Sequence, residues 1–161
     1  MFMKLRLEVL TTASIFAASS VLVADELDIA GRKLMVVRPT AELKAEEAVV
    51  GRVPLGTVLT ADRAEGSWIW IDSHQGWVRQ ADVLPAEEAI AHFTAAVQEQ
   101  PTSEAYHQRG VAYDALGRLD KALADFEQAL RVDPTNSAAW NNRGNLWQKK
   151  GDDHKAFADY T

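Results

Sequence analysis

The spacing of apolar residues separates a helical part of the chain from an alternating part. Between residues 119 and 132 apolar positions recur every three or four residues, which predicts one stripe of an amphipathic helix: Leu119, Ala122, Leu123, Phe126, Ala129 and Leu130. A looser stripe precedes it: Ala105, Tyr106, Gly110, Tyr113 and Leu116. Gly117 suits the turn between the two predicted helices, because glycine accepts a left-handed C-cap without a Cβ clash. Pro134 ends the second helix, because proline has no N–H to donate.

Residues 25–85 have a different pattern, with short apolar runs separated by turn residues such as Gly66 and Gly76. This pattern predicts a small all-β barrel or sandwich. In the run from Trp68 to Ile71 the side chains alternate, so Ile69 and Ile71 are expected to face the core. A unit of roughly 55 residues is near the lower limit for a self-sufficient core, which favours a compact barrel over a flat sheet.

The helical pattern starts again after 34 residues. Residues 103–136 are followed from Ser137 by a similar stretch, in which Trp140 replaces Tyr106 and Gly144 replaces Gly110. This period and pattern resemble the tetratricopeptide repeat, a helix–turn–helix unit. Upstream, the spacing of Ala89, Phe93, Ala96 and Pro101 matches that of Ala122, Phe126, Ala129 and Pro134. The resemblance therefore implies a half repeat at 86–102, a full repeat at 103–136 and a truncated repeat at 137–161.

The strings PLGTVLTADRAEG and GSWIWIDSHQGWVRQADVL resemble bacterial SH3-like domains, in which PxGT, G-x-W and GWV strands form the centre of the barrel. Asp82-Val83 stand where many members have an aromatic residue. Together the two resemblances imply a mixed, two-domain fold. A small SH3-like β-barrel in residues 25–85 would be followed by an all-α tetratricopeptide helical-hairpin solenoid in residues 86–161.

Residues 1–24 have the pattern of a secretory signal peptide. Lys4 and Arg6 precede an uncharged stretch, residues 9–23, and Ala24 offers a cleavage site before Asp25. This uncharged stretch is too short, and too rich in Ser and Thr, for a typical membrane span. The alternatives are an uncleaved membrane anchor and a mistaken start codon. We expect an exported protein, periplasmic or in the cell envelope, with no stable membrane span after signal removal.

Composition and motifs argue against several classes of function. A net charge of −6 and the lack of a basic stripe disfavour a nucleic-acid partner. The sequence has no cysteine and none of the common catalytic motifs. His74 near Asp72, and His154 after Asp152-Asp153, resemble metal corners, but neither supplies the three or four ligands that a site needs. We expect neither an enzyme nor a cofactor.

Three tryptophans in the β part form a possible aromatic ligand patch: Trp68, Trp70 and Trp77. Trp68 and Trp70 are expected to share the outer face of the strand, and two exposed tryptophans are a large apolar surface. One alternative is that they cover the junction with the helices. Another is that they pack with Trp77 and Val36 as a second small cluster.

The tetratricopeptide resemblance implies a groove, lined by the first helix of each repeat, that holds an extended peptide. By position in the repeat, the groove residues are Glu104, His107, Val111, Asp114, Asn141, Asn142, Asn145, Gln148 and Lys149. Asparagine suits such a groove, because one amide both donates to and accepts from a peptide backbone. The alternative for each residue is an ordinary solvated helix face.

These observations predict a non-enzymatic protein–protein interaction scaffold of the cell envelope, which binds a protein or peptide partner in the groove. One alternative is binding of a cell-wall peptide or glycan through the SH3-like barrel. Another is an accessory subunit of an envelope enzyme, which the sequence does not distinguish from a scaffold.

Overall fold

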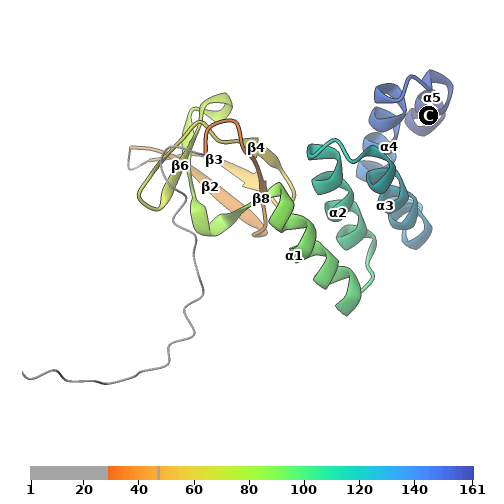
Figure 1. Ribbon diagram of the computed structural model, residues 1–161, viewed down its shortest axis with the longest axis horizontal. Coiled ribbons are helices and arrows are strands. Elements are labelled where there is room, and N and C mark those ends of the chain that lie inside the picture. The colour runs from red at the N-terminus through yellow and green to blue at the C-terminus, as the bar shows by residue number, and fades with distance from the viewer. Residues whose placement is uncertain (1–28, 47) are drawn as a thin grey trace, which may run out of the picture.

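The computed structural model describes residues 29–46 and 48–161, so the predicted signal peptide lies outside the described residues. A small β domain is followed by five helices that stack side by side away from it (Figure 1). The predicted fold class, a β domain followed by a tetratricopeptide-like helical solenoid, is confirmed. In the described part of the chain no helix has the length and apolar character needed to cross a bilayer.

The β domain contains two antiparallel sheets. The three-stranded sheet has the order β4-β1-β8, formed by Val58–Thr60, Lys33–Val36 and Val83–Pro85. The five-stranded sheet has the order β3-β2-β7-β6-β5, formed by Ala48–Pro54, Thr40–Ala45, Gly76–Arg79, Trp68–Ile71 and Arg63–Glu65. Short 3-10 turns, Asp72–His74 and Gln80–Asp82, flank β7.

One apolar core lies between the two sheets. It includes Leu34 and Leu59 from the three-stranded sheet and Ile69, Ile71 and Val78 from the five-stranded sheet. The alternation predicted for β6 is therefore correct. Among the described residues no strand ladder joins the two sheets, so the strands form two packed sheets instead of the closed barrel that the sequence suggested. The resemblance to SH3-like domains stays a prediction.

The helices are α1 (Ala86–Glu99), α2 (Ser103–Ala115), α3 (Leu119–Val132), α4 (Ser137–Lys149) and α5 (Asp153–Tyr160). The side chains of Thr102, Asn136 and Asp152 cap α2, α4 and α5 by accepting a hydrogen bond from the backbone N–H three residues on. Gly117 turns the chain from α2 to α3 with φ of 69°, as the sequence predicted. Consecutive helices therefore form the hairpins of a helical repeat.

A close approach of α2 and α3 explains the glycine at position 110. A Cβ atom there would lie 2.6 Å from Cε1 of Phe126, which is fully buried. The next hairpin repeats this geometry, since a Cβ at Gly144 would lie 2.5 Å from Cε1 of Tyr160. The glycine and the aromatic residue therefore form one packing unit that occurs twice.

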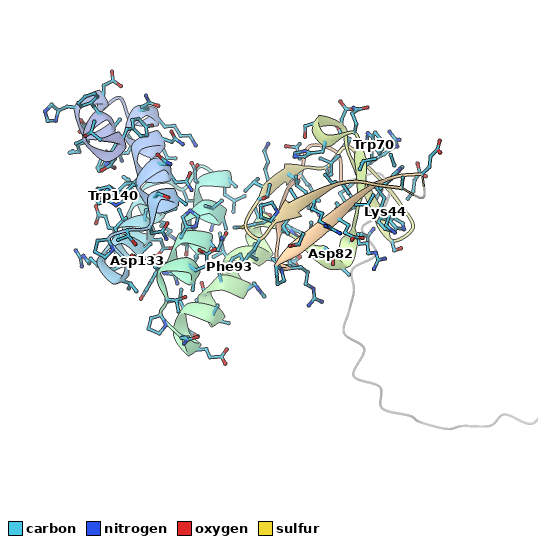
Figure 2. All side chains as sticks on the ribbon, turned by 180° about the vertical axis from the view of Figure 1, so that it is seen from behind. Lys44, Trp70, Asp82, Phe93, Asp133 and Trp140 are labelled. Carbon is cyan, nitrogen blue, oxygen red and sulfur yellow. The ribbon has the colours of Figure 1, made fainter. Side chains whose placement is uncertain are left out.

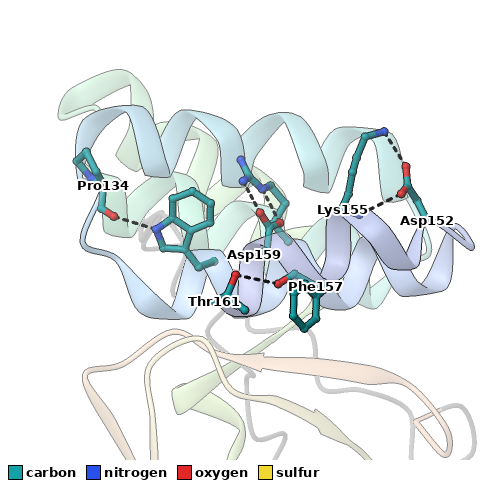
Figure 3. Close-up of polar contacts among 8 residues, drawn as sticks. Pro134, Asp152, Lys155, Phe157, Asp159 and Thr161 are labelled. Atoms are coloured by element: carbon teal, nitrogen blue, oxygen red, sulfur yellow. Dashed lines mark hydrogen bonds and ion pairs between the residues drawn. The ribbon is translucent and has the colours of Figure 1, made fainter.

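Each hairpin also contains a buried ion pair. Arg109 on α2 donates two hydrogen bonds to Asp125 on α3, at 2.7 and 2.6 Å. Arg143 on α4 donates two to Asp159 on α5, at 2.8 and 2.5 Å (Figure 3). Both aspartate side chains are almost completely buried. Such two-bond pairs fix the relative orientation of the helices that they join.

The β domain packs directly on α1 and α2. Strand β8 ends at Pro85 and α1 begins at Ala86, so no linker separates the two parts. A second apolar cluster fills the junction: Met35, Ala89, Phe93 and Ala112 are buried, and Val37, Leu55, Leu84, Ile90 and Val111 pack against them. The helix α1 corresponds to the second helix of a repeat that has no first helix. The β domain contacts α1 and α2 at the place where that first helix would lie.

Candidate functional site

The predicted groove residues lie on α2 and α4, the first helices of the two hairpins, and we call this surface the α2–α4 face. It comprises Glu104, His107, Val111, Asp114, Asn141, Asn142, Asn145, Gln148 and Lys149. Two contacts join the helices across it. Asn142 Nδ2 lies 2.9 Å from His107 Nε2, and Lys149 Nζ donates to both carboxylate oxygens of Asp114 at 2.6 and 2.8 Å. Four of the nine residues are therefore paired with one another.

The sequence suggested that His107 is an exposed residue of the groove, but the structure differs. Its side chain is buried, and its ring lies 5.7 Å from the ring of Phe126. Nδ1 is also buried and has no hydrogen-bond partner among the described residues. Burial lowers the pKa of His107 below 6.5, although the nearby Glu104 carboxylate opposes this effect. The histidine is therefore held neutral inside the helical stack.

We expect the stability of the protein to fall between neutral and mildly acidic pH because of His107. Its pKa is lower in the folded than in the unfolded chain, so the unfolded chain binds more protons as pH drops below about 6.5. The stabilisation is complete above that pH and is lost as pH falls toward the folded pKa. Urea denaturation at several pH values should give a smaller decrease for His107→Gln than for the wild type. Equal decreases would mean that His107 does not cause the effect.

The α2 side of the α2–α4 face is occupied by internal contacts. Val111 packs against the junction cluster, which includes Leu55 of the β domain. The Glu104 carboxylate accepts a hydrogen bond from Gln108 Nε2. A partner segment would find few unpaired groups here.

The exposed amides of α4 form the open part of the face. Asn145 Oδ1 accepts a hydrogen bond of 2.7 Å from the Tyr160 hydroxyl, which also lies 3.2 Å from Gln148 Oε1. Asn141 is exposed, and its side chain has no hydrogen bond to any described residue. Asn141 is therefore the amide on this face that is most available to a peptide backbone.

Gln108 is a buried polar residue that the sequence reasoning missed. It stands 34 positions before Asn142, so its position in the repeat could have identified it. It is 4% exposed, and its Oε1 has no partner among the described residues. Gly56 of the β domain lies against this side chain, since a Cβ at residue 56 would overlap Oε1. The β domain therefore covers Gln108. Asn142 holds the equivalent position one repeat later.

The three predicted tryptophans lie on the outer face of the five-stranded sheet, which we call the tryptophan face. Trp70 on β6 pairs with Trp77 on β7, and their rings meet edge to face with centroids 5.3 Å apart. Trp68 pairs with Glu65 on one side and Arg79 on the other. All three are half-buried.

The tryptophan face is separate from the junction with the helices. The junction cluster contains none of the three tryptophans, and Val36 belongs to the β-domain core instead of packing with them. Trp70 and Lys44 lie on the β domain, clear of the helices (Figure 2). A hollow of about 550 Å³ opens on this face, lined by Lys44, Glu46, Glu65, Trp68 and Trp77.

The described histidines do not form metal sites with neighbouring carboxylates. In residues 29–46 and 48–161 no three His, Asp or Glu side chains are close enough together to hold a metal ion. His74 Nδ1 lies 2.9 Å from the Ser73 hydroxyl in the turn before β7. The two surfaces above are therefore the candidate binding sites.

Comparison with known proteins identifies the helical part. Family models of the tetratricopeptide repeat match residues 103–136 and residues 126–158. The chain is 38% identical over 52 residues to "Tetratricopeptide repeat domain-containing protein PYG7, chloroplastic" from Arabidopsis thaliana, covering 32% of this chain and 17% of that protein. It is 38% identical over 84 residues to "Tetratricopeptide repeat and J domain-containing co-chaperone DNJ1" from Cryptococcus neoformans var. grubii, covering 49% and 16%.

Among solved structures, "MamA 41-end" from Desulfovibrio magneticus RS-1 has a TM-score of 0.46 and 25% identity, covering 47% of this chain and 43% of that one. The matched stretches span about a sixth of the length of the two curated relatives named above. The two family matches show that residues 103–158 of this chain consist of tetratricopeptide repeats, and the first match has the 34-residue length that the sequence predicted.

Proposed function

We propose that the protein is a non-enzymatic interaction scaffold of the cell envelope, and that it binds an extended segment of a partner protein along the α2–α4 face. The tetratricopeptide repeats support a protein partner, and one relative is a co-chaperone by name. The observation that carries the proposal is the row of exposed amides on α4, where Asn141 is unpaired among the described residues. Such an amide hydrogen-bonds a peptide backbone whatever the peptide sequence is.

Asn141→Ala is expected to weaken partner binding and leave stability unchanged. The loss of one hydrogen bond costs on the order of 1 kcal/mol, which is about a fivefold loss of affinity. The measurement is recovery of partners from an envelope extract by the full chain, followed by titration of the recovered partner. Gln98→Ala is the matched control, because Gln98 is an exposed amide on α1, outside the face. Equal affinity of wild type and Asn141→Ala would reject the α2–α4 face as the site.

Point variants are a better comparison here than removal of the β domain. Met35, Leu55 and Leu84 complete the apolar cluster under α1 and α2. A fragment of residues 86–161 would expose this cluster, and its failure to bind would not identify the site. Asn145→Ala is also less informative than Asn141→Ala, because it removes the hydrogen bond from Tyr160.

A second candidate function is the binding of a cell-wall peptide or glycan on the tryptophan face. The hollow beside Trp68 and Trp77 favours it, because concave sites with aromatic walls and a few polar groups are typical of ligand sites. In that case Trp68→Ala would reduce recovery of the ligand, and Asn141→Ala would not.

A further inference from the structure

The tryptophan face holds a cation of the protein's own near each indole ring. The Arg63 guanidinium lies 4.9 Å from the ring centroid of Trp70 and 5.0 Å from that of Trp77. Arg79 lies 5.3 Å from the ring centroid of Trp68, and Lys44 Nζ lies 5.7 Å from the same centroid. Positive charge is attracted to the negative face of an indole ring. The face is therefore arranged to hold cations.

The hollow is lined by two carboxylates, Glu46 and Glu65, and by one cation, Lys44. Lys44 stands opposite Trp77 in the sheet, and Glu65 stands opposite Trp68. Lys44 forms no ion pair with a carboxylate of the described residues, although Glu46 and Glu65 line the same hollow. Glu65 is 3.4 Å from Arg63 and its side chain is 65% exposed, so this pair is worth little in free energy. The two carboxylates are thus available to a second cation.

We propose that this hollow binds the lysine or arginine side chain of a basic protein segment. The incoming cation takes the position of Lys44 at the ring of Trp68, and Glu46 and Glu65 provide the counter-charges. Lys44 shows where a cation sits in this hollow, and it can leave because it has no carboxylate partner among the described residues. The net charge of −6 also attracts a basic segment at long range.

Two other classes of ligand fit the hollow less well. An anion would have Lys44 to bind but would face two carboxylates in the same space. A neutral sugar would leave the excess negative charge of Glu46 and Glu65 over Lys44 in the hollow without a partner. The proposal rests on the second candidate function only in using the tryptophan face as the binding site, and it names a basic protein segment as the ligand. It does not depend on the α2–α4 face.

The test is an NMR titration of the full chain, which follows the indole N–H signals of its tryptophans. The probes are Nα-acetyl-arginine amide and Nα-acetyl-lysine amide, with Nα-acetyl-glutamate amide and chitotriose for comparison. We expect the two cationic probes to shift the signals of Trp68 and Trp77 and to leave those of Trp140 and Trp147 unchanged. The shifts should decrease as salt is added, because the site is exposed.

Variants of the full chain test the roles of the individual charges. Lys44→Met removes the internal cation and should tighten binding of the cationic probes severalfold. Glu65→Gln should weaken it at least threefold. Lys121→Met is the matched control, because Lys121 Nζ lies 5.5 Å from the ring of Tyr113 on the helical part, and it should change nothing. A melting curve for each variant checks that the fold is intact.

Three results would overturn the proposal. Tighter binding of the glutamate probe than of the arginine probe would show that the hollow takes anions. Shifts of Trp68 with chitotriose and not with arginine would leave the second candidate function standing and reject the cationic ligand. No shift with any of the four probes would reject both.

Discussion

Ile69→Asp is expected to unfold the β domain. Ile69 is 3% exposed in the core between the two sheets, where it pairs with Val78 and Ala64 of the neighbouring strands. A carboxylate in that position would have no partner, and burying an unpaired charge costs several kcal/mol. A small domain has only about 5–15 kcal/mol of total stability. Circular dichroism with urea denaturation should therefore show the loss of the folded state.

Trp70→Ala is the matched control for this variant. Trp70 is the next residue on the same strand, but it points to the opposite side of the sheet and meets Trp77 edge to face. Loss of that contact costs about 1 kcal/mol. If both variants unfolded the domain to the same extent, the assignment of the two faces of β6 would be wrong.

Arg109→Leu is expected to lower the free energy of unfolding by about 3–5 kcal/mol. The variant leaves the Asp125 carboxylate buried without its partner, since that side chain is 6% exposed and accepts both of its side-chain hydrogen bonds from Arg109. Arg143→Leu, at the equivalent pair with Asp159, should have a similar effect. Lys155→Met is the control, because the pair of Lys155 with Asp152 is exposed and its loss should change stability far less (Figure 3).

The double variant Arg109→Leu with Asp125→Leu separates the cost of the stranded charge from the value of the pair. Replacing both partners of a buried pair by apolar residues is often close to neutral. The double variant should therefore be more stable than Arg109→Leu in thermal denaturation. If it were as unstable as the single variant, the loss would come from the packing of the arginine stem, and not from an unpaired carboxylate.

The sequence predicted those features that depend on local spacing. The period of 34 residues and the turn at Gly117 follow from which residue types occur three, four or 34 positions apart. The inward direction of Ile69 and Ile71 follows from simple alternation. These patterns are sufficient because each reflects the geometry of one helix or one strand.

Contacts between helices or strands could not be predicted from the sequence. The pairing of His107 with Asn142, and of Asp114 with Lys149, depends on how two helices stack, and it uses up side chains that looked available to a ligand. Position in the repeat also gives no sign that the β domain covers Gln108. Likewise, the cations beside the tryptophans come from β2, β5 and β7, and their placement depends on a strand register that alternation alone does not give.

The packed junction between β8 and α1 also affects avidity. Because the apolar cluster around Met35 and Phe93 holds the β domain on the helices, the tryptophan face and the α2–α4 face keep a fixed separation. A flexible linker would let two sites adapt to many partners, whereas a rigid one raises the effective concentration only for a partner whose two epitopes have the same spacing. The junction would then select partners by the distance between their epitopes as well as by their chemistry.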